Sequence, residues 1–300
     1  MKACVAVLLI ALVSGVLLAQ EASFKIDVQL VRLLVTVKNP AGDLVGNLEA
    51  RDFSVFDNGV AQTITVFEHQ TTQPLSVTLL IDTSGSTAKD LKYEIVSLTK
   101  FLNALLREGN PQDAASLYSF NDEVTLLNSF TRRLTRLEDN LKPLKSDSGT
   151  SLYDAIYLSS SALRDRDGRH VIVVVTDGGD TTSTKKYADA RAAAQRADAI
   201  FFPIVVVPIS NPAGRNTGGE HALETLAAST GGRAFYPTVA ELDRTFTDIL
   251  RELRTQYLIG YYPRGATVGD GKFHTVRLEL PRHKDLQIST RTGYYGVVSR

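Results

Sequence analysis

The chain has 300 residues, of which 43% are hydrophobic, and its 33 basic and 33 acidic side chains balance. This length and apolar content suit one large or two modest domains with a buried core, and they exclude disorder as the default state. Because the charges cancel, no global field draws the protein to nucleic acid or to an anionic membrane surface. Any binding must therefore come from a local site.

Residues 1–20 have the pattern of a secretory signal peptide. Lys2 is followed by a long apolar run, and small residues stand at Ala19 and Ala22, so we expect cleavage after one of these two. An apolar run of about 17 residues is short for a membrane span, which leaves an uncleaved anchor as the second interpretation. The single cysteine, Cys4, lies in this segment, so the mature chain has no thiol. We expect an exported protein, periplasmic or at the cell surface, without a membrane span after cleavage.

Residues 21–74 and 257–300 are strand-rich flanks. The runs rich in β-branched and aromatic residues cover residues 28–37, 52–56 and 62–67 in the first flank and 257–262, 273–280 and 286–295 in the second. Turn sequences such as Asp57-Asn58-Gly59 separate these runs. A lone three-stranded sheet is marginal. We therefore expect the two flanks to pair into one sandwich-like module.

Residues 75–256 have a different pattern, in which short apolar runs alternate with segments of helical period. Strands are predicted at residues 77–81, 114–120, 171–175 and 200–207, and helices at 91–106, 151–163, 187–197, 220–228 and 239–256. The first, third and fourth of these strands are apolar throughout, which is typical of parallel strands buried on both faces. The fold class is therefore α/β, with a doubly wound and mainly parallel sheet inserted into the β module.

Polar side chains follow three of the predicted strands. The first strand leads into Asp82-Thr83-Ser84-Gly85-Ser86, a second loop carries Thr150 before a helix, and a third strand ends at Asp177. Ligands bind at the carboxyl ends of strands in open α/β sheets. The sequence therefore predicts a site of three hydroxyls and two carboxylates at this edge.

These three motifs resemble, in order and in spacing, the metal-ion-dependent adhesion site (MIDAS) of von Willebrand factor A (VWA) domains. The flanks are similar to those of a bacterial exported branch of that family. The resemblance implies that Ser84, Ser86 and Thr150 ligate Mg²⁺, or else Mn²⁺ or Ca²⁺. Asp82 and Asp177 would bind the ion directly or hold its waters. It also implies a non-enzymatic adhesion module whose protein partner presents an Asp or Glu carboxylate.

The chemistry of the donors agrees with this implication. Mg²⁺ prefers octahedral oxygen ligands and keeps several waters. Neutral hydroxyls leave the ion with residual positive charge for an incoming carboxylate. The alternative is a structural or assembly scaffold of the cell envelope in which the fold packs without using a metal. Singly, the serines and the threonine are also ordinary helix caps, and Asp177-Gly178 is also an ordinary turn.

Two enzyme classes share parts of these motifs. A subtilisin-like protease also needs a histidine base, and no histidine lies between Asp82 and Ser151, where that family's order requires it. Haloacid dehalogenase phosphatases need a second acid where this chain has Ser84. The sequence also lacks a Gly-x-x-x-x-Gly-Lys phosphate loop. An enzyme is therefore not expected.

Two further features have plain interpretations. The pairs Tyr261-Tyr262 and Tyr294-Tyr295 are expected to pack in a sheet, with an aromatic binding surface as the alternative. Asp180 is expected to be a solvated loop carboxylate, with a contact to a second ion as the alternative.

Overall fold

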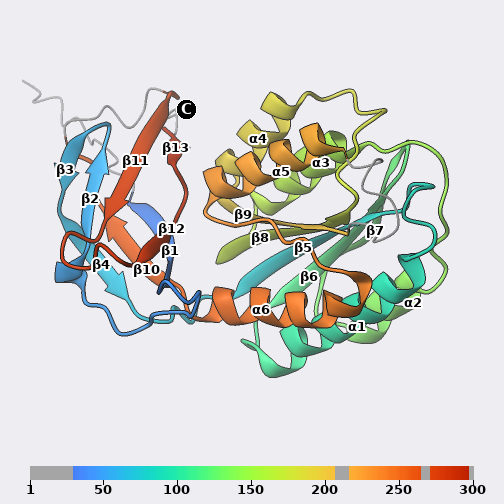
Figure 1. Cartoon of the computed structure of the whole chain (residues 1–300), viewed down its shortest axis with the longest axis horizontal. Coiled ribbons are helices and arrows are strands. Elements are labelled where there is room, and N and C mark those ends of the chain that lie inside the picture. The colour runs from blue at the N-terminus through green and yellow to red at the C-terminus, as the bar shows by residue number, and fades with distance from the viewer. Residues whose placement is uncertain (1–29, 207–215, 265–270, 297–300) are drawn as a thin grey trace, which may run out of the picture.

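The structure is a computed structural model that describes residues 30–206, 216–264 and 271–296. An α/β domain lies beside a smaller module built from two antiparallel sheets (Figure 1). The predicted signal peptide, residues 1–20, lies outside the described residues. Within the described part, no helix is both long and apolar enough to cross a membrane.

The central sheet of the α/β domain has five strands in the order β7-β6-β5-β8-β9. Four strands are parallel: β5 (Leu75–Asp82), β6 (Ala114–Phe120), β8 (Arg169–Thr176) and β9 (Ala199–Val205). The edge strand β7 (Val124–Thr131) is antiparallel. Every residue of β5 and β8 is buried, as expected for strands covered on both faces.

Helices cover both faces of this sheet (Figure 1). One face packs against α1 (Leu91–Glu108), α2 (Leu134–Leu141) and α6 (Leu242–Arg254), and the other against α3 (Leu152–Leu163), α4 (Tyr187–Arg196) and α5 (Thr217–Thr230). Successive side chains of β5 point to opposite faces, so Leu79 joins the first core and Leu80 the second. The predicted doubly wound α/β fold is confirmed.

The flanks pair with each other, as predicted. The first sheet has the order β12 (Gln287–Ser289), β1 (Val31–Lys38), β10 (Tyr257–Tyr261) and β4 (Ile64–Glu68), and the second has the order β13 (Gly293–Tyr295), β11 (Phe273–Glu279), β2 (Ser54–Asp57) and β3 (Val60–Gln62). Each sheet therefore combines strands from both flanks. Side chains of the two sheets, among them Leu33 and Val55, share one apolar core, so the flanks form a β-sandwich.

Some elements differ from the sequence prediction. The run at 286–295 forms two strands in different sheets, because residues 290–292 cross from one sheet to the other. The strand β7 and the helix α2 were not predicted. Short 3-10 turns lie at Ala50–Asp52 and Val239–Glu241, and the second leads into α6.

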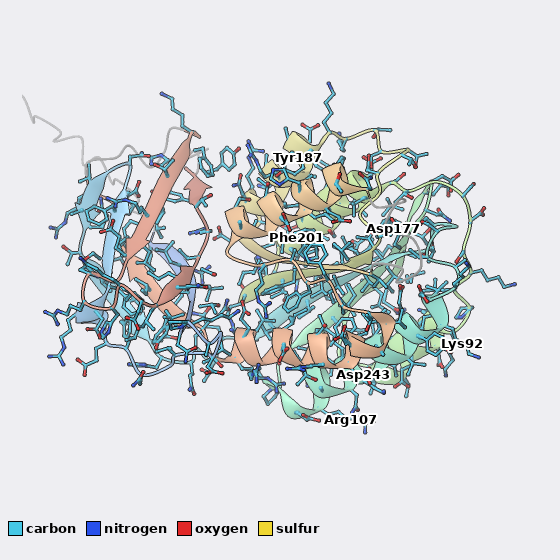
Figure 2. All side chains as sticks on the ribbon, in the orientation of Figure 1. Lys92, Arg107, Asp177, Tyr187, Phe201 and Asp243 are labelled. Carbon is cyan, nitrogen blue, oxygen red and sulfur yellow. The ribbon has the colours of Figure 1, made fainter. Side chains whose placement is uncertain are left out.

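The sandwich contacts the α/β domain at the C-terminal end of α6. The Glu252 carboxylate, 1% exposed, accepts bonds from Lys38 Nζ at 2.6 Å and from Arg233 Nε at 3.0 Å. Nearby, Thr71 N donates to Gln256 O at 3.2 Å, which ties the two segments that cross between the domains. Figure 2 places Asp177 on the side of the α/β domain away from the sandwich.

Candidate functional site

Three loops meet at the carboxyl edge of the central sheet. Asp147 N donates to Thr83 O at 2.8 Å, which joins the loop after β5 to the loop before α3. Thr181 N donates to Thr150 O at 2.8 Å, which joins the loop before α3 to the loop after β8. Thr176 Oγ1 donates to Asp82 Oδ2, which joins the end of β8 to the end of β5. The predicted meeting of these loops is therefore observed.

Asp82 is the buried centre of the cluster. It ends β5 with no exposed surface. Its Oδ1 accepts a bond from Ser84 N at 2.9 Å, and its Oδ2 accepts one from Thr176 Oγ1 at 2.6 Å. Burial raises the pKa of the Asp82 carboxyl to about 6, and the negative charge of Asp177 adds to the increase.

The hydroxyls of Ser84 and Ser86 lie side by side, with their Oγ atoms 3.0 Å apart. Ser84 is 3% exposed, whereas Ser86 is open to solvent. Thr87 holds the loop in this shape, because its Oγ1 donates to both Asp82 O and Ser84 O at 3.0 Å. The loop thus presents a buried carboxylate and two hydroxyls, one of which solvent reaches.

Thr150 is 6% exposed and is held through its backbone by the loop that follows Asp177. Its N–H donates to the hydroxyls of Thr181 at 3.0 Å and Thr182 at 3.2 Å. The preceding residue, Gly149, has φ +76°, and a Cβ there would lie 2.7 Å from the Asp122 side chain. A left-handed, closely packed turn of this kind favours glycine.

Asp177 follows β8 and is partly exposed. Its Oδ1 accepts a bond from Gly179 N at 3.1 Å, so the residue also shapes a local turn. Its negative charge adds to the rise in the pKa of Asp82.

The interpretation of the three hydroxyl residues as helix caps is wrong. The N-cap positions are occupied by Asp90 at α1 and by Ser151 at α3, and neither side chain makes a capping hydrogen bond. Asp180 is not a free solvated carboxylate, because its Oδ1 accepts from Tyr153 N at 3.1 Å in the first turn of α3 and from Ser183 Oγ at 2.6 Å.

The sequence prediction missed two residues of the cluster. Thr176 binds Asp82, but a threonine at the end of an apolar strand is indistinguishable from ordinary strand packing. Glu94 is 1% exposed in the first turn of α1, and burial raises the pKa of its carboxyl to about 8. The sequence does indicate that Glu94 is buried, because it falls in the same helical stripe as Leu91 and Leu98.

The tyrosine pairs are mainly structural. Asp57 Oδ2 accepts bonds from Tyr261 Oη at 3.0 Å and Tyr294 Oη at 2.7 Å inside the sandwich. Tyr295 packs under the Arg196 guanidinium of α4. Tyr262 is the member of these pairs that is 48% exposed. The expectation of sheet packing therefore agrees with three of the four tyrosines.

The donor set is made of oxygen atoms. No group of three or more His, Cys, Asp or Glu side chains within the described ranges is placed to hold a metal ion. The five predicted ligands include two carboxylates and three hydroxyls, and hydroxyls are outside such a group. Direct ligation here would therefore depend on Ser84, Ser86 and Thr150.

Comparison with known proteins agrees with this fold. A family model described as the von Willebrand factor type A domain matches residues 77–179. The solved vWF domain of the type V pili tip protein Mfa5 from Porphyromonas gingivalis is 15% identical with a TM-score of 0.50, and the match covers 60% of this chain and 95% of that chain. At this identity it shows the fold alone.

Two further solved structures are less similar in shape. The PilB minor pilin from Streptococcus sanguinis is 14% identical with a TM-score of 0.48, covering 63% of each chain. An aerotolerance-related membrane protein from Bacteroides fragilis is 18% identical with a TM-score of 0.46, covering 60% of this chain and 98% of that chain. No curated protein matches the chain in sequence.

Proposed function

The chain contains a von Willebrand factor type A domain, a kind of module that binds proteins and mediates adhesion, and from this premise we propose that it captures a partner's carboxylate through a divalent cation. Ser84, Ser86 and Thr150 would supply ligand hydroxyls. Asp82 and Asp177 would bind the cation or its waters. Mg²⁺ is the preferred ion, with Mn²⁺ and Ca²⁺ as the alternatives.

The observation that carries this proposal is the buried Asp82 carboxylate beside the paired hydroxyls of Ser84 and Ser86. Asp177 carries a second negative charge, which raises the pKa of Asp82 further. A buried charge is normally paired or bound to a metal. A divalent cation at this edge would balance both carboxylates, and oxygen donors are those that hard cations prefer.

The combination of neutral hydroxyls and carboxylates explains how a cation at this site would bind a partner rather than only stabilise the fold. Hydroxyl ligands carry no charge, so the ion would keep much of its own. Ser86 is exposed, which leaves the ion an approach from solvent. An Asp or Glu of a partner would then complete the coordination. Cation and partner should tighten each other's binding, because the coupling of two ligands is reciprocal.

We also propose that the module is non-enzymatic and acts outside the cytoplasm. The described histidines have partners other than the site serines: His170 contacts the carbonyls of Ala197 and Arg166, and His221 pairs with Glu224. This supports the absence of a serine–histidine nucleophile. The signal sequence expected at residues 1–20 supports export to the periplasm or the cell surface.

Calorimetric titration of the chain with Mg²⁺, Mn²⁺ and Ca²⁺, with and without an acidic peptide, tests the function. We expect weak cation binding that tightens when the peptide is present and that is lost in Asp82→Asn. Asp113→Asn is the matched control, because Asp113 is also buried but binds Leu75 N at the opposite end of β5. Binding that is absent from the wild-type chain would instead support the scaffold function.

A further inference from the structure

Glu94 is a buried carboxyl group that the predicted ligand set does not use. It is 1% exposed, and its Oε2 has no hydrogen-bond partner among the described residues. Its helix, α1, begins shortly after the loop that carries Ser84 and Ser86, so its first turn lies at the site end of the helix. An unpaired polar atom in the interior costs free energy. No described side chain offsets this cost at Glu94 Oε2.

Packing and helix electrostatics do not explain an acid at this position. The buried stripe of α1 otherwise consists mainly of apolar residues, such as Leu91, Leu98 and Phe101. A leucine would fill the stripe without loss of solvation. An acid near a helix N-terminus is favourable, but a solvent-exposed acid provides that benefit without burial.

The charges around Glu94 point toward the cation site. Those that act on its pKa belong to Asp82, Asp90 and Asp177, and all three raise it. Two of these three belong to the predicted ligand set. The three carboxylates come from the end of β5, from the turn before α1 and from the loop after β8, and Glu94 is tied to the second of these segments because its N–H donates to Asp90 O at 3.0 Å.

The helices packed against α1 carry other charges. On α6, Asp243 is bound by Lys100. On α2, the charged side chains are those of Arg136, Glu138 and Asp139. Two of these, Arg136 and Asp139, are exposed to solvent. The charges that act on the pKa of Glu94 are instead those of Asp82, Asp90 and Asp177.

We propose that Glu94 is a positioning residue of the cation site, whose carboxylate accepts a hydrogen bond from a water molecule bound to the cation. The inference rests on the proposed function, since it needs a cation at Asp82. Glu94 acts through water, because Asp82, Asp177 and Glu94 are not placed as a direct ligand group among the described residues. Mg²⁺ usually keeps several waters, and groups that orient a metal's ligands affect its affinity strongly.

Binding of the cation would then be coupled to release of a proton. Without the cation, burial and three neighbouring carboxylates keep Glu94 protonated at neutral pH. A bound cation would favour the ionised form of Glu94, and its proton would pass to solvent. Glu94 would thus be a charged acceptor when the cation is bound and a neutral acid when it is absent.

The test is calorimetric titration of the full chain with MgCl₂ at pH 7, in buffers that differ in ionisation enthalpy. For Glu94→Gln we expect a Kd weakened by about ten- to a hundredfold and the loss of most of the proton release. Glu94→Asp, which retains the charge, should recover part of both. Asp113→Asn is the control for a buried carboxyl far from the site, and it should keep the wild-type values.

The two proposals fail in different ways. If Asp82→Asn loses cation binding while Glu94→Gln keeps the wild-type Kd and proton count, the role of Glu94 is overturned and the proposed function stands. If the wild-type chain binds no cation, both are overturned. Circular dichroism of each variant shows whether it is folded, and a folded Glu94→Gln with weakened binding supports the inference.

Discussion

Without a bound cation, the free energy of unfolding of the wild-type chain should fall as the pH rises. Replacing Glu94 by glutamine should remove most of this fall. The folded state raises the pKa of this carboxyl from 4.5 to about 8. Between these values the native protein binds a proton that the unfolded chain has released. The contribution of the protonated group is therefore fully present below about pH 4.5 and is lost as the pH rises to about 8.

The expected magnitude follows from the shift. One pKa unit corresponds to about 1.36 kcal/mol, so the change in pKa predicts a loss on the order of 4 kcal/mol between pH 5 and pH 8.5. This is a large fraction of the total stability of a typical domain. Glutamine fills the same space without titrating, so the free energy of unfolding of this variant should depend less on pH.

Urea denaturation in EDTA at pH 5 and pH 8.5 measures this loss. The control is Glu108→Gln, since Glu108 lies on the same helix but is exposed to solvent. We expect the wild type and Glu108→Gln to lose stability equally, and Glu94→Gln to lose much less. Parallel losses in all three proteins would refute the assignment of this pH dependence to Glu94.

Three further predictions concern the sandwich and its contact with the α/β domain. Tyr294→Phe removes one of two hydroxyl bonds to Asp57 and should cost about 1.5–3 kcal/mol in urea denaturation; an unchanged midpoint would contradict that bond's contribution. Glu252→Gln leaves Lys38 without its carboxylate partner and should lower the stability by about 3 kcal/mol, with wild-type stability as the contrary result. Removal of residues 257–300 takes strands from both sheets, so trypsin should then digest the N-terminal flank, and a flank that stays resistant would disprove its dependence on the C-terminal strands.

The sequence predicts the parallel sheet well because β5, β8 and β9 contain long apolar runs. β5 and β8 are buried at every position and lead directly into polar loops, which marks both the strands and the site. β7 was missed because it is an edge strand with an irregular burial pattern and register shifts against β6. Its side chains do not follow the simple alternation that a half-buried strand would show.

The candidate site was predictable where its residues follow the carboxyl ends of predicted strands or precede a predicted helix. Asp82 ends β5, and Ser84 and Ser86 follow it in the next loop. Thr150 and Asp177 stand in loops that the parallel sheet brings to the same edge. Thr176 and Glu94 are linked to Asp82 only through the fold, because Thr176 donates to Asp82 from the end of β8 and the charge of Asp82 raises the pKa of Glu94. A glutamate in a helix is usually assigned to the solvent face, and only its alignment with Leu91 marks it as buried.

The two chain segments that cross between the domains also have a mechanical consequence. If the proposed partner were bound at the carboxyl edge of the sheet and pulled against an anchored sandwich, the force would leave the α/β domain through the segment from β4 to β5 and through the segment from α6 to β10. The bond from Thr71 N to Gln256 O joins these two segments side by side. Tension would therefore be shared by two covalent links, and a double tether of this kind resists twisting as well as stretching.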